Sequence, residues 1–324
     1  MLSDDILLRA EHVTRRFRTP SGRQLTACDD VSLQIHRGKT LGLLGESGCG
    51  KSTFAKMLVG IQPPSQGHIY LGERDIASLK GEELRQNCRH IQMVFQDPAE
   101  AFNPKMKIWE IVTEPLTNLG LLKRSQCREK ARELLAQVEL TEDFLDRLPH
   151  TMSGGQRQRV GIARALALDP ELIICDEATS ALDVSIQQTI TRLLVKLQRE
   201  KGLAYIFIGH DPALVQSLSH WVAVMYLGSV VEIIPGAQLC TGSEHPYTKA
   251  LLGAMFTLDM DFDRPIDSID TEPPTAVERG DRCAFCDRCA CCSRLCREKK
   301  PVLKELGSDH WVACHHVHGE KGLL

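Results

Sequence analysis

A glycine-rich stretch at residues 45–52, GESGCGKS, carries residue types that together could bind a polyphosphate. It fills the pattern G-x-x-x-x-G-K-S/T, with an apolar run before it and an apolar helical stretch after it. Glycines let the backbone curl so that successive N–H groups point into one concavity, which the N-terminal amides of the next helix also face. Lys51 would add a positive charge near the β and γ phosphates, and the Ser52 hydroxyl would ligate Mg²⁺. The alternative, an ordinary glycine-rich turn with a chance lysine, is disfavoured by the complete pattern.

Two acids, Asp176 and Glu177, follow the continuous apolar run at residues 172–175, which is typical of a buried parallel strand. Acids at a strand tip beside a phosphate-binding loop indicate a Walker B site. Asp176 would hold Mg²⁺ through water, while Glu177 would polarise the attacking water. The alternative is that the pair only caps the helix that follows. His210 follows another apolar strand, residues 204–208, so we expect it at the same end of the sheet and in contact with the γ phosphate.

The elements that must position these residues follow from hydrophobic periodicity. Residues 31–35 alternate apolar and polar side chains, and with residues 7–17 they predict a small antiparallel sheet ahead of the loop. Residues 108–168 carry apolar side chains at helical spacing and predict an all-helical insertion. Its last helix would begin after Ser153 and two glycines, which present another helix N-terminus. Gln96 follows a short apolar run and is expected at a strand end.

The composition limits the function classes. The chain has 324 residues, enough for one large domain with an appendage or for two modest domains. Its 39 basic and 42 acidic side chains give a net charge of −3, so no nucleic-acid partner is expected. The N-terminus lacks the basic region of a signal peptide, and the apolar runs fall short of the roughly 20 residues that a spanning helix needs. We therefore expect a soluble, cytoplasmic protein.

With these motifs in this order, the first 235 residues resemble an ABC-type ATPase. The sequence SGGQ at residues 153–156, which precedes the Walker B acids and follows a helical insertion, distinguishes this family from other P-loop proteins. The resemblance implies an α/β fold: a P-loop NTPase (RecA-like) core, an antiparallel β subdomain, a helical subdomain at about residues 97–168, and a small cysteine-rich C-terminal extension. It divides the chain into a nucleotide-binding domain, residues 1–235, and an extension, residues 236–324.

The resemblance also implies how ATP is bound and cleaved. Two chains would form a head-to-tail dimer, in which the SGGQ loop of one chain closes over the nucleotide that Lys51 of the other holds. Phe17 is the candidate for the ring that stacks on adenine, and a core-facing phenylalanine is the alternative. Because Glu177 is present, the chain is expected to hydrolyse ATP, with Gln96 and His210 as further catalytic residues.

The implied ligands of Mg²⁺ are Ser52, Gln96 and Asp176. The full set of residues implied to bind nucleotide and Mg²⁺ comprises Phe17, Gly45, Ser47, Gly48, Cys49, Gly50, Lys51, Ser52, Thr53, Gln96, Ser153, Gly154, Gly155, Gln156, Asp176 and Asp183.

Residues beyond 235 resemble one branch of this family. The sequence HPYTKALL at residues 245–252 is similar to an element of peptide and nickel importer ATPases, and the motif Cys283-x-Phe285-x-x-Arg288-Cys289 is similar to part of their C-terminal extension. The resemblance implies an ATPase subunit that powers the import of peptides or nickel-type metal complexes by ATP-driven dimer closure. Its implied partners are two integral membrane permease subunits, a second ATPase subunit, and indirectly an extracytoplasmic solute-binding protein.

The implied location is peripheral, at the cytoplasmic face of the inner membrane. Residues from Gln96 onward, including Asn103 and Pro104, would form the groove that receives a helix of the membrane subunit. A hypothesis from another class stays open: a cytosolic ABC-type ATPase whose tail senses redox state or metal and takes no part in transport.

Seven of the 13 cysteines lie between Cys283 and Cys314, after an acidic, proline-containing stretch at residues 257–282 that predicts a linker. Four of them match the positions that bind a 4Fe-4S cluster in some family members, and thiolates are natural ligands of such a cluster. These four residues are Cys283, Cys289, Cys296 and Cys314.

Two alternatives to the cluster remain. Zinc could be bound by cysteines together with nearby histidines, or the thiols could be free. Ligand choice is ambiguous, because further cysteines interrupt the pattern at Cys286, Cys291 and Cys292. The candidate zinc-binding histidines are His310, His315, His316 and His318.

Overall fold

Two long strands near the N-terminus form the antiparallel sheet that the alternating pattern predicted. In the computed structural model, which describes residues 5–20, 22–178, 182–253, 280–307 and 309–319, β1 (Ile6–Arg18) pairs with β2 (Gln24–His36). β4 (Gln66–Leu71) pairs with β1, and the short β5 (Arg74–Asp75) completes the order β2-β1-β4-β5. Alternate side chains of β2 are buried, which explains why its sequence alternates.

The main sheet positions the ends of its parallel strands along one edge. Its strand order is β11-β12-β10-β9-β3-β8-β7-β6. Because neighbours among β9, β3, β8, β7 and β6 run parallel, the residues that follow these strands emerge side by side. These strands are β3 (Thr40–Leu44), β6 (Ile91–Val94), β7 (Leu172–Asp176), β8 (Ala204–Ile208) and β9 (Trp221–Tyr226).

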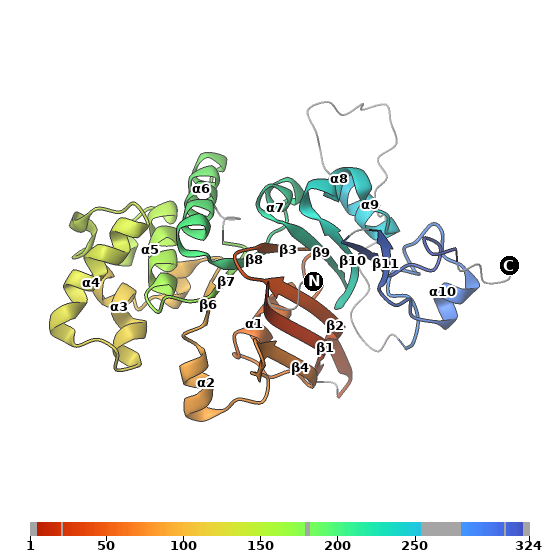
Figure 1. Cartoon of the computed structure of the whole chain (residues 1–324), viewed down its shortest axis with the longest axis horizontal. Coiled ribbons are helices and arrows are strands. Elements are labelled where there is room, and N and C mark those ends of the chain that lie inside the picture. The colour runs from red at the N-terminus through yellow and green to blue at the C-terminus, as the bar shows by residue number, and fades with distance from the viewer. Residues whose placement is uncertain (1–4, 21, 179–181, 254–279, 308, 320–324) are drawn as a thin grey trace.

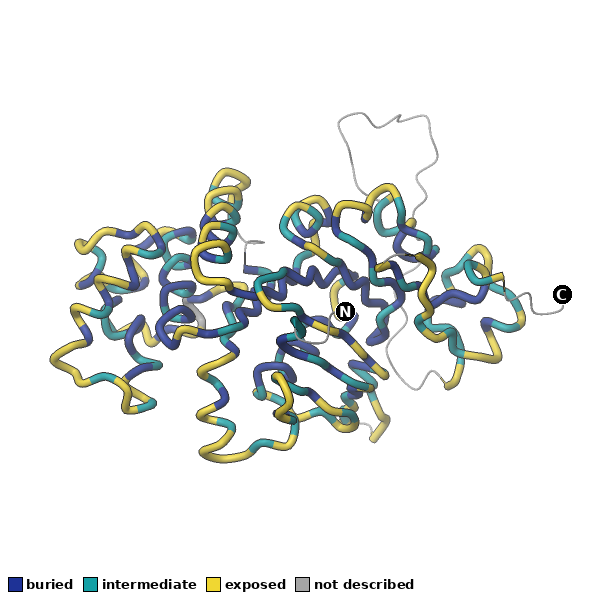
Figure 2. Tube along the Cα trace, in the orientation of Figure 1, coloured by how far each residue is buried: buried dark blue, intermediate teal, exposed yellow. Residues whose placement is uncertain are grey.

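Successive side chains of the central strands enter two different cores, one on each face of the main sheet. Leu44, Ile173 and Phe207 pack in one core, whereas Leu43 and Ile174 pack in the other. The alternation follows from the two-residue repeat of a strand. It explains why β3, β7 and β8 are buried at every position and read as continuous apolar runs (Figure 2).

Helices cover the sheet and build a separate layer beyond its β6 edge, at the left of Figure 1. This layer contains α3 (Ile108–Asn118), α4 (Arg124–Gln137) and α5 (Gly154–Leu166), as the helical insertion predicted. The other helices of the nucleotide-binding part are α1 (Lys51–Leu58), α2 (Gly81–Asn87), α6 (Val184–Lys201) and α7 (Pro212–Leu218). Short 3-10 turns connect these elements: η2 (Pro98–Ala101), η3 (Glu142–Phe144) and η4 (Pro149–Thr151).

The C-terminal part is joined to the core rather than set apart from it. β12 (His310–Val312) pairs with β10 (Ser229–Pro235), and β11 (Lys304–Gly307) pairs with β12, so two tail strands extend the main sheet. Between β10 and β11 in the sequence lie η5 (Gly236–Gln238), α8 (Leu239–Gly242), α9 (Pro246–Gly253) and α10 (Arg294–Glu298). Most of the predicted linker lies outside the described residues. The division at residue 235 remains a prediction.

Within the described part of the chain, no helix combines the length and the apolar character that crossing a membrane requires.

Candidate functional site

The loop between β3 and α1 has a shape that only glycine permits at two positions. Gly45 has φ of 153°, and a Cβ atom there would lie 2.2 Å from the carbonyl oxygen of Met225. Gly50 has φ of 110°, and a Cβ there would lie 2.2 Å from the carbonyl oxygen of Ala27. The two glycines therefore let the loop lie directly against β9 and β2. Gly48, also at positive φ, is exposed.

Lys51 is held inside this loop. Its Nζ donates to the carbonyl oxygens of Gly45, at 2.7 Å, and Glu46, at 2.8 Å, and the residue is only 4% exposed. A lysine ammonium in a ring of backbone groups is a point charge already placed for a phosphate. Cys49 beside it is buried, and burial raises the pKa of its thiol. The remaining predicted loop residues are Ser47, which is exposed, and Thr53, which is half-buried in α1.

Ser52 and Asp176 meet where α1 begins and β7 ends. The Ser52 hydroxyl donates to Asp176 Oδ1 at 3.0 Å. Burial raises the pKa of Asp176, the Ser52 hydrogen bond opposes that rise, and the neighbouring charge of Glu177 adds to it. A hydroxyl and a carboxylate at this distance are hard oxygen ligands of the kind Mg²⁺ prefers, so this donor set fits the ion.

Glu177 and His210 form a pair at the same sheet edge. His210 Nε2 lies within ion-pair distance of Glu177 Oε1, and the backbone N–H of Glu177 donates to the carbonyl of Ile208 at 3.0 Å. Glu177 has φ of 51°, a conformation that costs a non-glycine residue about 1 kcal/mol and that occurs often at functional sites. The strained backbone and His210 together fix the direction of the carboxylate.

Two other predicted residues lie near the edges of this arrangement. Gln96 is exposed two residues beyond β6, the strand next to β7, which confirms its predicted place at a strand end. Phe17 is partly exposed in β1, with the guanidinium of Arg15 4.7 Å from its ring centre. The partial exposure of the ring leaves a face open to solvent, and the adenine-stacking role of Phe17 remains a prediction.

The SGGQ loop begins α5 in the helical layer. The Ser153 hydroxyl accepts from the N–H of Gln156 at 3.3 Å, and Gln156 Oε1 accepts from the N–H of Ser153 at 2.9 Å, which is a capping box. A Cβ on Gly155 would lie 2.6 Å from Cγ2 of Ile186, so the glycines bring α5 against α6. Ser153 is exposed, and so is Asp183 at the start of α6.

The predicted residues thus form two separate groups. Lys51, Ser52, Asp176, Glu177 and His210 come together at the edge of the main sheet. The Ser153 loop begins α5 in the helical layer and Asp183 precedes α6, and in Figure 1 α5 lies apart from α1.

Two C-terminal residues for which the sequence predicted no role also reach the phosphate loop. The N–H of Glu46 donates to the hydroxyl of Tyr247 at 3.0 Å. Arg288 donates through both terminal nitrogens to the carboxylate of Glu46, at 2.8 and 3.1 Å. Both lie within motifs that the sequence shares with the importer branch, HPYT and C-x-F-x-x-R-C, and this was the signal that could have marked them.

The four cysteines of the predicted cluster surround one small cavity, but they do not form a metal site. Cys283, Cys289, Cys296 and Cys314 line it together with Cys286. Among the described residues, no three or more histidine, cysteine or acidic side chains are placed to hold a metal ion. Burial raises the pKa of Cys283 to about 12 and that of Cys289 to about 11. The 4Fe-4S prediction is therefore unsupported.

The zinc alternative is also unsupported, because the same absence of a converging ligand group among the described residues applies to it. Three of its four candidate histidines each use Nε2 in a contact within the C-terminal part. His310 Nε2 lies 2.8 Å from Glu232 Oε1. His315 Nε2 lies 3.0 Å from the Lys299 carbonyl oxygen, and His318 Nε2 lies 2.9 Å from that of Val312. These contacts join β12 to β10 and stabilise the chain on either side of β12.

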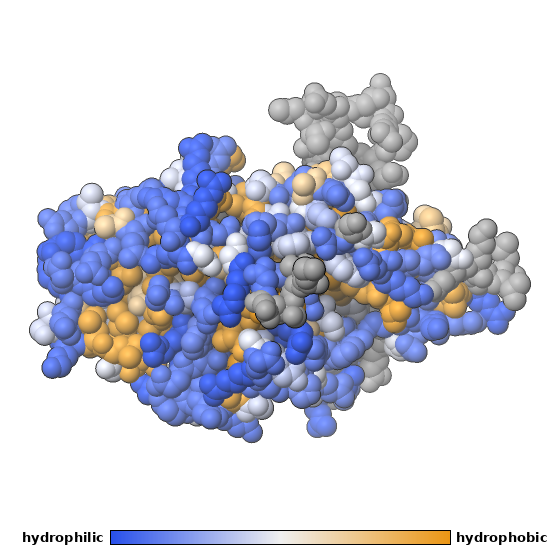
Figure 3. All heavy atoms as spheres, in the orientation of Figure 1, coloured by the Kyte–Doolittle hydropathy of each residue, from blue (hydrophilic) through white to orange (hydrophobic). Residues whose placement is uncertain are grey.

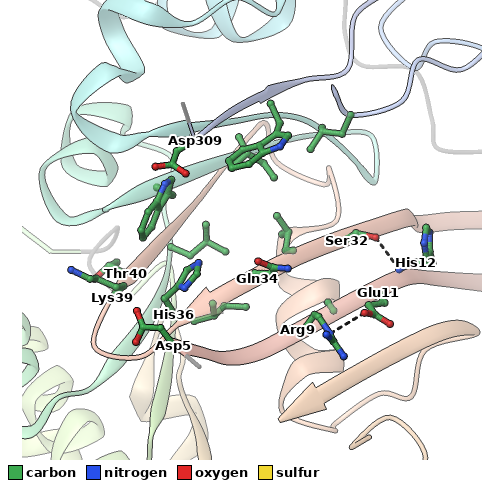
Figure 4. A pocket seen from close by; sticks show the side chains of 18 residues that line it. Asp5, Arg9, Glu11, His12, Ser32, Gln34, His36, Lys39, Thr40 and Asp309 are labelled. Atoms are coloured by element: carbon green, nitrogen blue, oxygen red, sulfur yellow. Dashed lines mark hydrogen bonds and ion pairs between the residues drawn. The ribbon is translucent and has the colours of Figure 1, made fainter. Parts of the chain in front are cut away.

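A cavity of about 720 Å³ between the two sheets is separate from this site (Figure 4). Trp221 and Trp311 line it, with His36, whose ring centre lies 5.2 Å from that of Trp221. It reaches β3 at Thr40 and Leu41, the opposite end of that strand from the phosphate loop. None of the predicted nucleotide-binding residues lines it.

Family models match both parts of the chain. One described as ABC transporter matches residues 28–180, and one described as oligopeptide/dipeptide transporter, C-terminal region, matches residues 231–296.

Known proteins resemble almost the whole length of the chain. A probable peptide ABC transporter ATP-binding protein from Sinorhizobium fredii is 44% identical over 317 residues, covering 96% of this chain and 90% of the relative. The oligopeptide transport ATP-binding protein OppF from Salmonella typhimurium is 42% identical over 323 residues, covering 96% of each chain. These relatives are named for peptides, so the nickel prediction has no support from them. The alternative of a sensor without a transport role is not favoured.

Solved structures resemble the nucleotide-binding part. A dimeric structure of the ATP-binding cassette MJ0796, in a post-hydrolysis state with ADP and phosphate, aligns with a TM-score of 0.65 and 31% identity. It covers 70% of this chain and 98% of that one. The protein cbiO1 from Clostridium perfringens, part of the ABC transporter complex cbiONQ, aligns with a TM-score of 0.65 and 28% identity, covering 74% of this chain and 92% of that one.

Proposed function

The chain belongs to the ABC transporter family of ATP-binding subunits, and from this premise we propose that it hydrolyses ATP to drive the import of peptides. The observation that carries the proposal is the row of contacts along one sheet edge: Lys51 inside its loop, Ser52 bonded to Asp176, and Glu177 paired with His210. These groups supply charge, Mg²⁺ ligands and a base in the order that phosphate cleavage needs.

Each group has a distinct task in this proposal. Lys51 and the loop amides bind the β and γ phosphates. Ser52 and Asp176 would hold Mg²⁺, which would neutralise phosphate charge. Glu177 accepts a hydrogen bond from the attacking water, and His210 keeps the carboxylate oriented. Gln96 completes the set from the neighbouring strand.

The same proposal requires two chains for each nucleotide. Ser153 and Asp183 are exposed, and the apolar side chain of Val184 beside Asp183 is 71% exposed. A second chain that buries this surface would bring its own Ser153 loop over the ATP held by Lys51. The related cassette MJ0796, solved as a dimer, supports this arrangement by analogy.

Coupling to membrane subunits is part of the proposal as well. The segment after Gln96 packs closely on α5, where a Cβ on Gly161 would lie 3.0 Å from Cβ of Pro98. Phe102, in the same segment, is buried. A helix of a permease seated here would therefore act on the helix that carries the SGGQ loop. Hydrophobic residues reach the surface over the helical layer (Figure 3), as a docking face for a permease requires.

The test is a Glu177→Gln variant, which keeps the shape of the side chain but removes its basic oxygen. We expect ATP binding to persist while turnover falls at least about a hundredfold. ATP should also shift the variant from monomer to dimer in analytical ultracentrifugation. Normal turnover would contradict the role of Glu177.

The matched control is Glu171→Gln. Glu171 pairs with Arg37 and His90 on the surface and should leave turnover unchanged. The transport part of the proposal is tested by co-purification with permease subunits and by peptide uptake in vesicles that contain the complex. Failure to recover any integral membrane partner, with turnover intact, would contradict it.

A further inference from the structure

We propose that Arg288, from the cysteine-rich tail, is a positioning residue for the phosphate loop: it neutralises Glu46 and so strengthens the binding of ATP. The proposal rests on the proposed function, since it assumes that the loop around Lys51 holds the nucleotide phosphates. The two residues are 242 positions apart in the sequence, so their contact is a tertiary feature of the folded chain.

Arg288 and Glu46 make a bidentate pair. Nη1 lies 2.8 Å from Oε2, and Nη2 lies 3.1 Å from Oε1, which is the planar fork that a guanidinium offers a carboxylate. The Arg288 side chain is 4% exposed and that of Glu46 is 23% exposed. A pair this far from solvent is screened little by salt, and loss of one partner leaves a charge uncompensated.

Aromatic rings hold Arg288 in place. Its guanidinium lies 5.7 Å from the ring centre of Tyr226, and its Nη1 lies 3.4 Å from the Tyr226 hydroxyl. Phe285, from the same tail motif, meets Tyr226 edge-on with ring centres 5.2 Å apart, and it lies 5.4 Å from Tyr247. Phe285 is 3% exposed. Packing against these aromatic rings therefore holds the guanidinium of Arg288 in one position.

Glu46 is bound through both its backbone and its side chain. Its N–H donates to the Tyr247 hydroxyl, its carbonyl accepts from Lys51, and its carboxylate accepts from Arg288. Two of these three partners come from beyond residue 235. The backbone contacts set the path of the loop at the position just before the exposed Ser47.

The sign of the effect follows from charge. A carboxylate on a loop that binds a polyphosphate repels the ligand unless a cation neutralises it. Arg288 supplies that cation from outside the loop, and Lys51 bonds instead to the carbonyl oxygens of Gly45 and Glu46 and to the sulfur of Cys49. Removing Arg288 should therefore weaken ATP binding through the charge of Glu46, and removing that charge should restore binding.

The experiment is a double-mutant cycle on the full-length chain, with Mg-ATP affinity measured by isothermal titration calorimetry. We expect Arg288→Met to raise Kd about tenfold, and Glu46→Gln to change it less than about threefold. The double variant Glu46→Gln with Arg288→Met should bind within about threefold of Glu46→Gln alone. Arg288→Lys, which keeps the charge but not the fork, should lie between the wild type and Arg288→Met.

The alternative is that Arg288 only holds the tail together. In that case Glu46→Gln would not rescue Arg288→Met, and this result would overturn the proposal. Unchanged affinity in Arg288→Met would overturn it too. If Arg288→Met does not fold, Arg288→Lys in the two Glu46 backgrounds decides: a weakening only where Glu46 is retained supports the proposal, and an equal weakening in both refutes it.

Two controls separate this proposal from its premise. Arg294→Met removes an exposed tail pair with Glu298 and should leave Kd unchanged. Lys51→Ala tests the loop itself: if it binds ATP as well as the wild type does, the proposed nucleotide site is wrong. If Lys51→Ala loses binding but Arg288→Met does not, only the present inference fails.

Discussion

Asp176 is expected to destabilise the nucleotide-free protein at neutral pH, and replacing it with asparagine should reveal this cost. The residue is 9% exposed, and burial raises the pKa of its carboxyl, with the charge of Glu177 acting in the same direction. A raised pKa means that the folded state favours the protonated form. Its contribution to stability is therefore fully present below the ordinary carboxyl pKa of about 4 and is lost as the pH rises through the higher folded value.

Asp176→Asn removes the charge and keeps the shape. Without nucleotide we expect the free energy of unfolding to increase by about 1 kcal/mol near pH 8, because a buried charge and its repulsion with Glu177 disappear. In a chain of this size, that corresponds to a rise in Tm of about 2 °C. As the pH falls toward about 4 the difference should shrink, since the raised pKa lets the wild-type carboxyl take up its proton before an ordinary aspartate does.

With Mg-ATP bound, the wild type should become the more stable of the two proteins. Anything that binds only the folded state stabilises it in proportion to the logarithm of concentration over Kd. The wild type offers Mg²⁺ a carboxylate and the variant offers an amide, so the wild type should gain more. Tm with and without Mg-ATP, by differential scanning fluorimetry at both pH values, measures both effects.

Asp143→Asn is the control, because the pKa of this carboxyl is shifted in the opposite direction from that of Asp176. A hydrogen bond from Thr141 and the charge of Arg147 lower the pKa of this exposed carboxyl, so its neutralisation should not stabilise the protein. Its response to Mg-ATP should equal that of the wild type. A less stable Asp176→Asn protein at pH near 8, or an undiminished gain from Mg-ATP, would refute the reasoning.

Two further predictions concern packing and pH. Gly155→Ala places a Cβ 2.6 Å from Ile186, so α6 must shift at its start. We expect the free energy of unfolding in urea to fall by about 1–2 kcal/mol, and ATP-dependent dimerisation to be weakened further. Unchanged values in both assays would count against the close packing of α5 on α6. Burial lowers the pKa of His245 to about 3, so the unfolded chain takes up this proton first as the pH falls. The contribution of His245 to stability should therefore be complete above about pH 6.5 and decline toward pH 3. His245→Asn can still accept from the N–H of Tyr247 and should show a flatter pH profile of stability in chemical denaturation.

The group of residues at the edge of the main sheet was predictable because each of them is marked by a short local sequence pattern. The loop pattern at Gly45, the acids after β7 and the residue after β8 each depend on a few neighbours in sequence. Parallel pairing then brings the strand ends together without further information. The place of Gln96 followed from the same rule.

Other features were not predictable because they depend on distant partners or on geometry. Nothing near Arg288 in the sequence names Glu46 as its partner. The pairing of β12 with β10 joins the tail to the core sheet across a segment of low periodicity. The metal prediction counted cysteines by position, whereas a site requires their thiols to converge, and the spacing of Cys283 and Cys314 contains no such information.

The C-terminal segment is bound to the core through one buried carboxylate, that of Glu232, and through Tyr247. Buried Glu232 of β10 accepts from the N–H groups of Glu244 and His245 and pairs with His310 of β12. Tyr247 then reaches the phosphate loop from the helix that His245 begins. A carboxylate that is 0% exposed requires such a set of donors, because an unpaired buried charge is costly. The sequence that marks the importer branch therefore supports the nucleotide loop directly, and the extension and the ATPase core are one structural unit in the part of the chain that the structure describes.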